Sequence, residues 1–422
     1  MKILWVTNSI FPELAEKIGT PTPTSGGWMF NLAKQLANLK NIELIIATVS
    51  DISNTIHENI NGITYYIIPT KKGRMNYDVS LENKWKELID KEKPDLTHIH
   101  GTEYAHGIAL MNACPNLKSV VSIQGMISVI SRYYAGGISK KNITKKISLR
   151  DVLLRQSFFS GEKMLRSRAN SEINSLQKAQ HVIGRTDWDK AHAITINPNV
   201  TYHFCNETLR ENFYKTKPWN IASCETNSIF LSQANYPLKG AHQVIKALPY
   251  ILKKHPKTKI KIAGTSTPFN SGKSLISRLK ETGYSKYLKY LIHKNNLKNN
   301  IHFLGPLNEV QMIKEYQSSH VFVCPSSIEN SPNSLGEAQL LGVPCVGSYV
   351  GGIPNMIKHK INGLLYRYEE IEMLAENIIS IFANDQYATE ISKKGLMTAE
   401  ERHNPQGNLT QLIKIYDTII AS

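Results

Sequence analysis

Two glutamates eight positions apart flank a proline-broken loop in the second half of the chain. They are Glu329 and Glu337, in the stretch SSIENSPNSLGEAQLLGVPCVG that starts at Ser326. Glu329 follows the apolar run HVFVCPS, which predicts a buried strand, and the residues after Pro332 predict a helix with Ser334 as its N-cap. Glu337 would then lie in the first helical turn, where the helix dipole favours a carboxylate.

This arrangement suits the chemistry of a nucleotide sugar. Free amides at a helix N-terminus bind phosphate, and carboxylates on either side accept hydrogen bonds from sugar hydroxyls. A simpler interpretation stays open for Glu337, because Ser334-x-x-Glu337 is also the pattern of a capping box. Glu329 has no comparable structural task in a loop at a strand end.

A second group of polar residues lies in the stretch HIHGTEY in the first half of the chain. His98 and His100 share one side of a predicted strand, so only His100, at the strand end, is expected to reach a substrate. Glu103 and Tyr104 follow on the adjoining loop. The alternative is that both histidines are strand residues satisfied within the fold.

Glycines mark two possible places where backbone approaches a ligand. Gly26 and Gly27 precede a predicted helix, where they either admit a ligand to its N-terminus or form a plain turn. The stretch GTSTPFNSGKS from Gly264 ends like a P-loop, but seven residues separate its glycines and a P-loop requires four. A P-loop is therefore not expected.

These candidates lie on elements that alternate between strand and helix. KILWVTN, IELIIATVS, DLTHIHG, SVVSIQG and HVIGRT predict strands in the first half, and IFLSQA, KIKIAG, IHFLGP, HVFVCPS and PCVGSY predict strands in the second. A polar stretch, Lys217–Ser228, suits a linker between them. Such alternation predicts two doubly wound domains with parallel sheets, with ligands at the carboxyl ends of the strands and the site in a cleft between the domains.

Length and composition agree with two globular domains. The chain has 422 residues, which is too long for one ordinary core, with 41% hydrophobic and 20% charged residues. No apolar run is long enough to span a membrane, and the N-terminus is too soon polar for a secretory signal. Five cysteines form no CxxC pair, which suits a reducing cytosol.

The net charge of +16 favours anionic partners. Part of the excess lies in residues 139–168, where nine basic residues interleave with apolar ones that include Phe158 and Phe159. This segment predicts either a solvated basic face over a core-facing stripe or a helix on an anionic membrane surface. Nucleic acid is not expected as a partner, because no recognisable binding module is present.

The stretch SSIENSPNSLGEAQLLGVPCVGSYVGGIPNMI resembles the Glu-x7-Glu signature of retaining GT-B glycosyltransferases of family 4, the group 1 glycosyltransferases. FLSQANYPLKG, FLGPL and INGLLY resemble further elements of the family's donor domain. GGWMFNLAKQLA and DLTHIHG are similar, more loosely, to elements of its acceptor domain. The resemblance implies a GT-B fold of two Rossmann-like domains facing each other across a cleft.

The resemblance also implies roles for individual residues. Lys239 would neutralise the donor diphosphate, Glu337 would accept from the ribose, and Glu329 would hold the donor sugar; with His100 on the acceptor side, the expected catalytic residues are Glu329, His100 and Lys239. The expected donor-binding residues are Gly26, Gly27, Gln233, Lys239, Gly264, Asn333, Ser334, Leu335 and Glu337. The expected acceptor-binding residues are His100, Glu103, Tyr104 and Gln124. No metal and no cofactor are expected besides the donor, a UDP-sugar by preference.

Three positions depart from the family pattern. Gln233 stands where an arginine is usual, Gln124 stands where a histidine is frequent, and Asn355 ends a Gly-Gly-x-Pro motif that usually ends in Glu. Gln233 removes one expected charge partner of the phosphate. Gln124 can hydrogen-bond a sugar but cannot act as a base.

The sequence thus predicts a retaining glycosyltransferase that moves a sugar from a nucleotide-diphosphate sugar to a glycan or polyprenyl-linked acceptor in bacterial surface polysaccharide synthesis. We expect an acceptor domain at 1–222, joined by a C-terminal helix at 407–422, and a donor domain at 223–406. The expected location is the cytoplasm, with possible attachment to the inner face of the membrane through residues 139–168. The alternatives are a nucleotide-sugar epimerase, a sugar phosphorylase and a nucleic-acid-binding protein.

Overall fold

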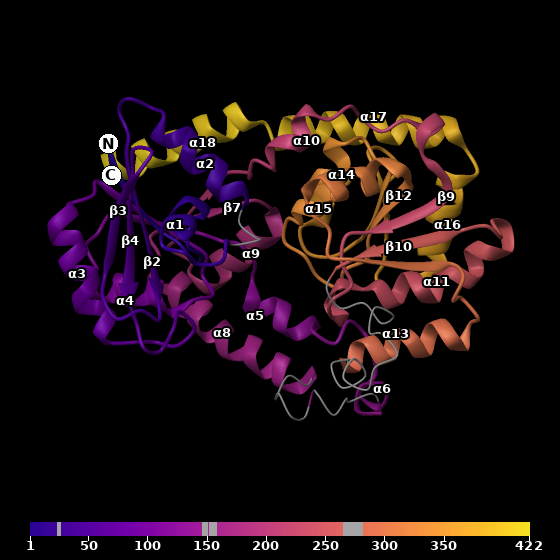
Figure 1. The fold of residues 1–422 in the computed structure, drawn as a ribbon, viewed down its shortest axis with the longest axis horizontal. Coiled ribbons are helices and arrows are strands. Elements are labelled where there is room, and N and C mark those ends of the chain that lie inside the picture. Colours follow the sequence, from indigo (N-terminus) through magenta and orange to yellow (C-terminus); the bar gives the residue numbers. More distant parts are fainter. Residues whose placement is uncertain (23–26, 146–150, 152–157, 265–281) are drawn as a thin grey trace. The chain divides into compact units, whose positions relative to one another are not determined.

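The chain folds into two compact units, each built on one β-sheet (Figure 1). The first unit comprises residues 1–129, 165–210 and 403–422, and the second comprises residues 130–164 and 211–402. The computed structural model describes residues 1–22, 27–145, 151, 158–264 and 282–422.

The first unit contains an eight-stranded sheet with the strand order β3-β4-β2-β1-β5-β6-β7-β8. All neighbouring strands are parallel except β3 and β4, which pair antiparallel at one edge. The strands are β1 (Lys2–Val6), β2 (Glu43–Ser50), β3 (Ile56–Ile60), β4 (Ile63–Pro69), β5 (Leu96–His100), β6 (Ser119–Ser122), β7 (His181–Gly184) and β8 (Thr201–Phe204).

Helices cover both faces of this sheet. Successive residues of a strand point to opposite sides, so a strand contributes residues to a core on each face. Ile3 and Trp5 of β1 belong to one apolar core, and Leu4 and Val6 belong to another. Residues of α2 and of the C-terminal helix α18 close the first core, and these two helices lie side by side in Figure 1. The helices of this unit include α1 (Pro12–Lys17), α2 (Gly27–Ala37), α3 (Ser80–Glu92), α4 (Ala105–Ala113), α9 (Asp187–Ile196) and α18 (Pro405–Ala421).

The second unit contains a six-stranded sheet that is parallel throughout, with the strand order β11-β10-β9-β12-β13-β14. Every residue of β12 is buried, as expected for a central strand covered on both faces. The strands are β9 (Glu225–Leu231), β10 (Lys259–Ala263), β11 (Ile301–Gly305), β12 (Ser319–Cys324), β13 (Cys345–Ser348) and β14 (Leu364–Tyr366).

Amphipathic helices connect these strands and pack on the sheet. The helices of the second unit include α6 (Lys140–Thr144), α10 (Glu211–Lys215), α11 (Ala241–Lys254), α13 (Gly283–Lys294), α14 (Glu309–Ser318), α15 (Asn333–Leu340), α16 (Ile371–Phe382) and α17 (Asp385–Arg402), with short 3-10 helices η1 (Ser131–Tyr133), η2 (Ile221–Ser223), η3 (Pro237–Lys239) and η4 (Ile353–Asn355). Two helices, α5 (Ile127–Ile130) and α8 (Phe158–Lys178), contain the points where the chain changes unit.

Each sheet has one topological switch point, where the strand order reverses. In the second sheet it lies between β9 and β12, because the chain continues from β9 to β10 on one side and returns to β12 on the other. In the first sheet it lies between β1 and β5. Ligands of doubly wound sheets bind outside the carboxyl ends of the strands at these points, so the loops after β5, β9 and β12 are the places to examine.

The predicted fold class, with two doubly wound parallel sheets, is confirmed. The compact units differ from the predicted domains at three places: residues 130–164 and 211–222 belong to the second unit, and residues 403–406 belong to the first. The last helix belongs to the first unit, in line with the expectation for residues 407–422.

The stretch Lys217–Ser228 is packed structure in the second unit and not the expected linker. Trp219 is 7% exposed, and its Nε1–H donates a hydrogen bond to the Ser319 carbonyl oxygen at 2.8 Å. Residues of the same stretch form η2 and begin β9. An apolar anchor amid polar residues explains why the polar composition misled the prediction.

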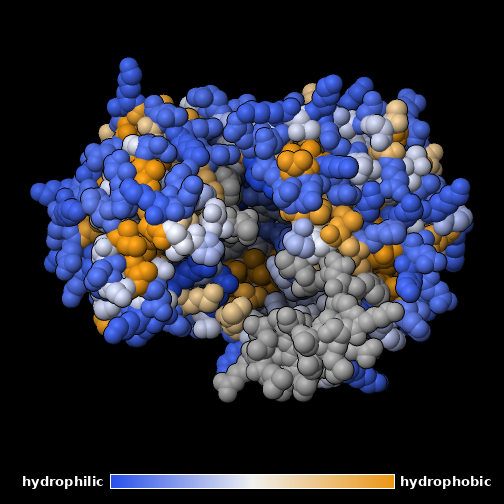
Figure 2. Space-filling view, in the orientation of Figure 1, coloured by the Kyte–Doolittle hydropathy of each residue, from blue (hydrophilic) through white to orange (hydrophobic). Residues whose placement is uncertain are grey.

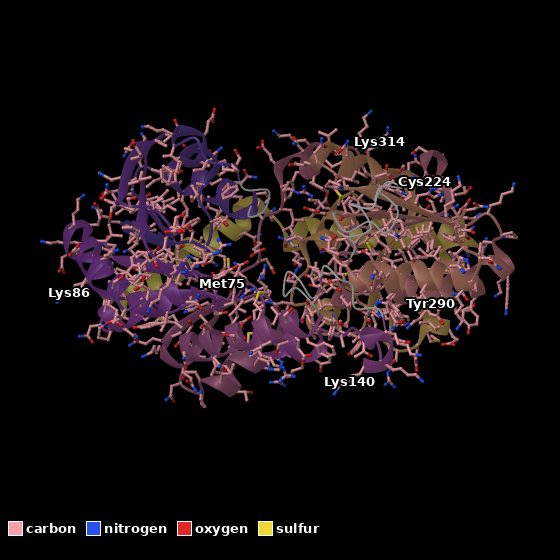
Figure 3. The ribbon with its side chains drawn as sticks, turned by 60° about the horizontal axis from the view of Figure 1, so that its bottom comes forward. Met75, Lys86, Lys140, Cys224, Tyr290 and Lys314 are labelled. Atoms are coloured by element: carbon pink, nitrogen blue, oxygen red, sulfur yellow. The ribbon has the colours of Figure 1, made fainter. Side chains whose placement is uncertain are left out.

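The basic segment 139–168 lies partly outside the described residues, because 146–150 and 152–157 are not described. Lys140, Lys141 and Lys145 are exposed, and Lys140 points away from the fold in Figure 3. Phe159 is exposed, whereas the Phe158 ring packs against Tyr134 with centroids 4.9 Å apart. Phe158 therefore packs within the second unit, and of the two phenylalanines only Phe159 is exposed.

Basic and acidic residues are distributed over the outside of both units. Figure 2 shows hydrophilic residues over most of the viewed face of each unit, with apolar residues in small separate groups. Lys86 on α3 and Lys314 on α14 project outward in Figure 3. Among the helices that the structure describes, none is long and apolar enough to cross a membrane.

Gly240 allows the loops after β9 and β12 to meet. Its φ is +69°, and a Cβ at this position would lie 1.7 Å from the Pro325 carbonyl oxygen. Close by, the Ser327 amide donates a hydrogen bond to the Leu238 carbonyl oxygen at 2.8 Å. The two loops at the switch point are thus joined backbone to backbone.

Replacing Gly240 with alanine should destabilise the second unit by about 2–4 kcal/mol, because strain at positive φ adds to a backbone clash. The matched control is Gly342→Ala, with φ +73° and its nearest neighbour, Ser392 Oγ, at an ordinary 3.4 Å. The measurement is urea denaturation of both variants. Equal midpoints for the two variants would show that the loops do not need this contact.

Candidate active site

A buried ion pair joins the two loops at the switch point of the second sheet. The Lys239 ammonium Nζ donates to the Glu329 carboxylate Oε1 at 2.6 Å, and these side chains are only 13% and 14% exposed. Lys239 ends η3 after β9, and Glu329 lies in the loop between β12 and α15. The Ser326 hydroxyl donates to the same carboxylate oxygen at 2.7 Å.

The environment keeps Lys239 positively charged. Burial alone lowers the pKa of Lys239, but the Glu329 carboxylate and Tyr236 outweigh burial and leave the pKa above its ordinary value. The Tyr236 ring centroid lies 6.0 Å from the ammonium. The Lys239 charge is largely enclosed and already paired with Glu329.

Glycines also shape the loop that carries Glu329. The Glu329 carbonyl oxygen accepts a hydrogen bond from the Gly352 amide at 3.0 Å. A Cβ on Gly351, whose φ is +52°, would lie 1.9 Å from that same oxygen. The position of the Glu329 backbone therefore requires the glycine pair that precedes η4. Helix η4 ends at Asn355.

Glu337 does not lie in the first turn of its helix. Helix α15 begins at Asn333 with Pro332 as N-cap, in an extended conformation and without a side-chain cap. Ser334 is therefore the second helical residue, Glu337 is the fifth, and neither the predicted N-cap nor the capping box exists. The prediction failed because the helix starts directly after the proline, whose fixed φ suits a helix entry.

The amides at the start of α15 are partly used within the helix. The Leu335 amide donates to the Pro332 carbonyl oxygen at 3.0 Å, and the Ser334 carbonyl oxygen accepts from the Tyr316 hydroxyl at 3.0 Å. Leu335 is fully buried, whereas Asn333 and Ser334 are half-buried. Of the predicted phosphate-binding positions in this helix, Asn333 and Ser334 are the accessible ones.

The other predicted donor residues lie at neighbouring strand ends, as far as the structure describes them. Gln233 is half-buried in the loop after β9, and Gly264 directly follows β10. A Cβ on Gly264, with φ +121°, would lie 2.6 Å from Asn235 Oδ1, so glycine lets these loops pack closely. Gly27 begins α2 of the first unit, and Gly26 lies outside the described residues.

His100 of the first unit ends β5 and is only 3% exposed. Its ring stacks on His98 with centroids 3.8 Å apart and meets the edge of Trp5 at 4.4 Å. Burial lowers the pKa of His100 to about 3, so the imidazole is neutral at physiological pH. His98 hydrogen-bonds the Tyr416 and Ser122 hydroxyls at 2.6 and 2.5 Å, which gives it the structural role that was the alternative for both histidines.

His100 faces a small pocket at the carboxyl ends of β5, β6 and β7, with an empty volume of about 410 Å³. Gln124, Arg185 and Glu207 also line it. Arg185 and Glu207 form a buried ion pair, and the Arg185 guanidinium donates to the Gln124 carbonyl oxygen at 2.7 Å. The sequence did not single out Arg185 or Glu207, although Arg185 directly follows a predicted strand in the way that His100 does.

Tyr104 lies close to two arginines that the sequence also did not single out. The Arg74 and Arg168 guanidinium carbons lie 5.0 and 4.9 Å from the Tyr104 ring centroid. Arg168 also approaches the Glu103 carboxylate at 3.6 Å. The predicted acceptor residues Glu103 and Tyr104 thus belong to a cationic cluster at the end of β5. The sequence did not reveal this cluster, because burial cannot be read from it and the residues are far apart in the chain.

Residues 215–396 match the family model "Glycosyl transferases group 1". The match contains the switch-point loops with both members of the ion pair. This part of the chain is therefore similar to the group 1 glycosyltransferases.

The chain matches several curated proteins at low sequence identity. An uncharacterized glycosyltransferase of Methanocaldococcus jannaschii is 26% identical over 223 residues, covering 52% of this chain and 53% of that protein. The N-acetyl-alpha-D-glucosaminyl L-malate synthase of Bacillus anthracis is 21% identical over 82% of this chain and 80% of that protein. The chain spans about half the length of several of the curated relatives it matches.

The fold extends beyond the matched segment. The crystal structure of Anabaena Alr3699/HepE in complex with UDP-glucose has a TM-score of 0.68 and 15% identity, over 99% of this chain and 100% of that one. The two Rossmann-like units of this chain therefore have the fold of the GT-B structures that they match.

The buried state of His100 predicts a pH-dependent stability. A histidine whose folded pKa is lowered stabilises the fold above its ordinary pKa of 6.5 and loses that contribution as pH falls toward about 3. We expect His100→Gln to flatten the acid dependence of the unfolding free energy below pH 6.5 by up to about 1.4 kcal/mol per pH unit.

Urea denaturation followed by tryptophan fluorescence at pH 7, 6 and 5 measures this effect. Four of the five tryptophans (Trp5, Trp28, Trp85 and Trp188) belong to the first unit, so the signal reports mainly on it. Parallel pH profiles for wild type and variant would contradict a buried neutral His100.

Proposed function

We propose that the chain is a retaining glycosyltransferase of family 4 that transfers a sugar from a nucleotide-diphosphate sugar to an acceptor hydroxyl without a metal ion. The observation that carries this proposal is the Lys239–Glu329 pair at the switch point of a domain that is similar to the group 1 glycosyltransferases. It provides a permanent cation for a leaving diphosphate and a carboxylate for a sugar, side by side.

The reaction breaks the bond between the anomeric carbon and the diphosphate oxygen and forms a bond to the acceptor oxygen on the same face, and the proton of the acceptor hydroxyl passes to the leaving diphosphate. Negative charge develops on the leaving diphosphate, and Lys239 is fixed where it can stabilise that charge without reorganising. Asn333 and Ser334 amides add hydrogen bonds in this proposal, and Glu337 accepts from the ribose hydroxyls. Because Gln233 carries no charge, Lys239 provides the main neutralisation.

The donor we propose is a UDP-sugar. Anabaena HepE has been crystallised with UDP-glucose, and this chain shares its fold over nearly its whole length. Gln233, Gly264 and the segment around Gly26 and Gly27 are proposed to border the donor.

The acceptor we propose is anionic, and a polyprenyl-linked glycan of bacterial surface polysaccharide synthesis satisfies this. Support comes from Arg74 and Arg168, whose guanidinium groups lie close to the Tyr104 ring. Tyr104 follows strand β5, which ends at His100. His100, neutral at physiological pH, accepts a hydrogen bond from the acceptor hydroxyl, with Glu103 and Gln124 as further contacts. Attachment of exposed Lys140, Lys141 and Lys145 to an anionic membrane surface belongs to the same proposal.

The first test is release of nucleoside diphosphate from a panel of nucleotide sugars. Wild type should slowly hydrolyse one donor, and Lys239→Ala should lower that rate at least 100-fold, within the range for loss of a transition-state charge partner. The matched control is Lys253→Ala, an exposed lysine on α11. Thermal melts accompany the assay, because removing Lys239 leaves the Glu329 charge unpaired. Normal hydrolysis by a folded Lys239→Ala variant would overturn the phosphate assignment.

Product analysis in the same assay separates the alternatives. A phosphorylase would require inorganic phosphate and release a sugar phosphate, and an epimerase would return an epimerised sugar.

Glu337→Gln should weaken UDP binding by about 1.5–3 kcal/mol, the range for a hydrogen bond to a charged group. Glu337 is buried, and the glutamine keeps its shape while it removes the charge. Isothermal titration calorimetry measures the effect, with Glu372→Gln in the exposed first turn of α16 as control. Unchanged UDP affinity would leave Glu337 with a structural role only.

A further inference from the structure

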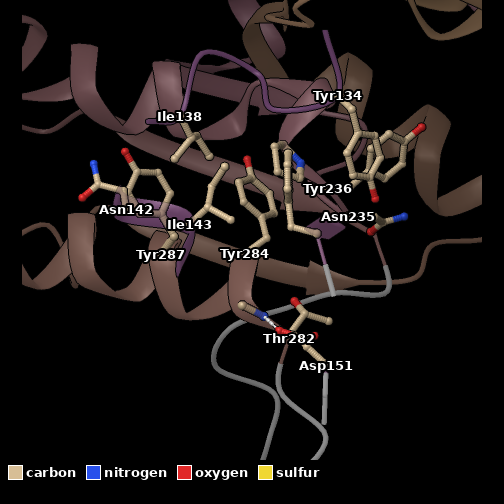
Figure 4. Close-up of a pocket in the computed structure, with 13 residues that line it drawn as sticks. Tyr134, Ile138, Asn142, Ile143, Asp151, Asn235, Tyr236, Thr282, Tyr284 and Tyr287 are labelled. Atoms are coloured by element: carbon tan, nitrogen blue, oxygen red, sulfur yellow. Dashed lines mark hydrogen bonds between the residues drawn. The ribbon is translucent and has the colours of Figure 1, made fainter. Parts of the chain in front are cut away.

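The second unit contains an aromatic pocket that the proposed donor chemistry does not use. Its empty volume is about 630 Å³, which includes space open to solvent. Four tyrosines contribute to its lining, namely Tyr134, Tyr236, Tyr284 and Tyr287, and Figure 4 shows them around Ile138 and Ile143. Polar groups lie at its ends, including Asn142, Asn235 and Thr282.

The wall of this pocket comes from residues 130–145, which are fastened to the donor half of the chain. The Gly136 carbonyl oxygen accepts hydrogen bonds from the Tyr368 hydroxyl and from His242 Nε2, both at 2.7 Å. Because Nε2 faces a carbonyl oxygen it carries the hydrogen, so Nδ1 accepts from the Tyr284 hydroxyl at 3.0 Å. Gly136 has φ +55°, and a Cβ there would lie 2.4 Å from the Pro237 carbonyl oxygen.

Further contacts hold this wall next to the proposed phosphate site. The Ser327 hydroxyl donates to the Tyr133 carbonyl oxygen at 3.1 Å, in the loop that leads to Glu329. The Tyr134 and Tyr236 rings are nearly parallel, at 18° with centroids 6.5 Å apart. Tyr236 is also the ring near Lys239, so a single tyrosine separates the pocket from the candidate diphosphate cation.

The far end of the pocket is closed by a carboxylate at a helix start. Asp151 is 4% exposed, and its Oδ2 accepts a hydrogen bond from the Gly283 amide at 2.9 Å, drawn as a dashed line in Figure 4. Thr282 is the N-cap of α13, with its side chain accepting from the Ser285 amide. The first amides of α13 are thus satisfied by protein groups, and this end of the pocket does not call for an anionic ligand.

One polar group in the lining does call for a ligand. Tyr287 is 5% exposed and lines the pocket, and no residue that the structure describes accepts a hydrogen bond from its hydroxyl. Asn142, on α6 at the same end in Figure 4, presents an amide side chain. The Tyr287 hydroxyl is therefore available to a hydrogen-bonding ligand in the pocket.

Aromatic faces combined with amide and hydroxyl groups match a pyranose ring. Apolar C–H faces of a sugar pack on tyrosine rings, and its hydroxyls both donate and accept hydrogen bonds. A purely apolar ligand such as a polyprenyl chain would leave Tyr287 and Asn142 unsatisfied. An anion would find the Asp151 carboxylate and no described cation in the lining.

We propose that this pocket is a second sugar-binding subsite, which holds a pyranose ring of the acceptor glycan between Tyr134, Tyr236 and Tyr287. The proposal rests on the proposed function, because it assigns the acceptor a glycan portion. Residues 130–145, from the half of the sequence expected to bind the acceptor, thereby contribute to acceptor specificity from within the second unit.

The test is saturation-transfer NMR on the full chain with methyl glycosides of glucose, galactose and N-acetylglucosamine as probes. At least one probe should bind wild type. Tyr287→Phe and Asn142→Ala should each weaken that binding at least threefold, and Tyr134→Ala should abolish it. Tyr290→Phe, on the exposed part of α13, is the matched control and should bind like wild type.

Three outcomes would overturn the proposal. The first is that no probe binds, and the second is that Tyr287→Phe and Asn142→Ala leave probe binding unchanged. The third is that UDP-glucose displaces the probe and UDP does not, which would make the pocket part of the donor site. Donor hydrolysis should be unchanged in Tyr287→Phe and Asn142→Ala, so failure here is distinct from failure of the proposed transferase activity. If Tyr134→Ala does not fold, the two conservative variants still decide the question.

Discussion

The ion pair between Lys239 and Glu329 is the interaction on which the arrangement of the donor half depends. It joins the loops after β9 and β12, the two strands that flank the switch point of the sheet. A buried pair of this kind adds little net stability compared with apolar packing, and losing one partner is costly. In the proposed function, the pair keeps a cation and a carboxylate in place at the switch point before a ligand arrives. The glycines at 240 and 351 serve the same end, because they let three loops approach closely enough for the pair to form.

Residues 130–145 give the second unit a surface that an ordinary doubly wound domain does not contain. They are held by buried hydrogen bonds from His242 and Tyr368 to one carbonyl oxygen, and burial lowers the pKa of His242 to about 3, so this contact persists through the physiological pH range. The aromatic pocket that results lies beside Tyr236, which also contacts Lys239. In the proposed function, Tyr134, Ile138 and Asn142 add to substrate specificity from outside the matched segment 215–396.

The sequence predicted two units with parallel sheets, all of their strands except β3, β4, β8 and β14, and the positions of Glu329, Lys239 and His100 at or after strand ends, because these features follow from short-range hydrophobic periodicity. It failed where tertiary contacts decide. Ser334 looked like an N-cap, but Pro332 sets the helix start one residue before Ser334. The Lys217–Ser228 stretch looked like a linker, but Trp219 anchors it. The burial of Lys239, the pairing of Arg185 with Glu207 and the two arginines at Tyr104 join residues far apart in the chain, and no local pattern encodes such pairs.

The measurement that tests the central claim most directly is a double-mutant cycle on nucleotide binding. The affinities of wild type, Lys239→Met, Glu329→Gln and the double variant for UDP and UDP-glucose would be compared by calorimetry. If the pair is the preorganised donor site, Lys239→Met weakens UDP at least tenfold. Glu329→Gln leaves UDP binding intact but removes the preference for UDP-glucose. The effects of the two substitutions on UDP-glucose binding are not additive in the double variant. UDP binding that is unchanged in Lys239→Met, or effects that simply add, would contradict the account and leave the pair as a structural contact between two loops.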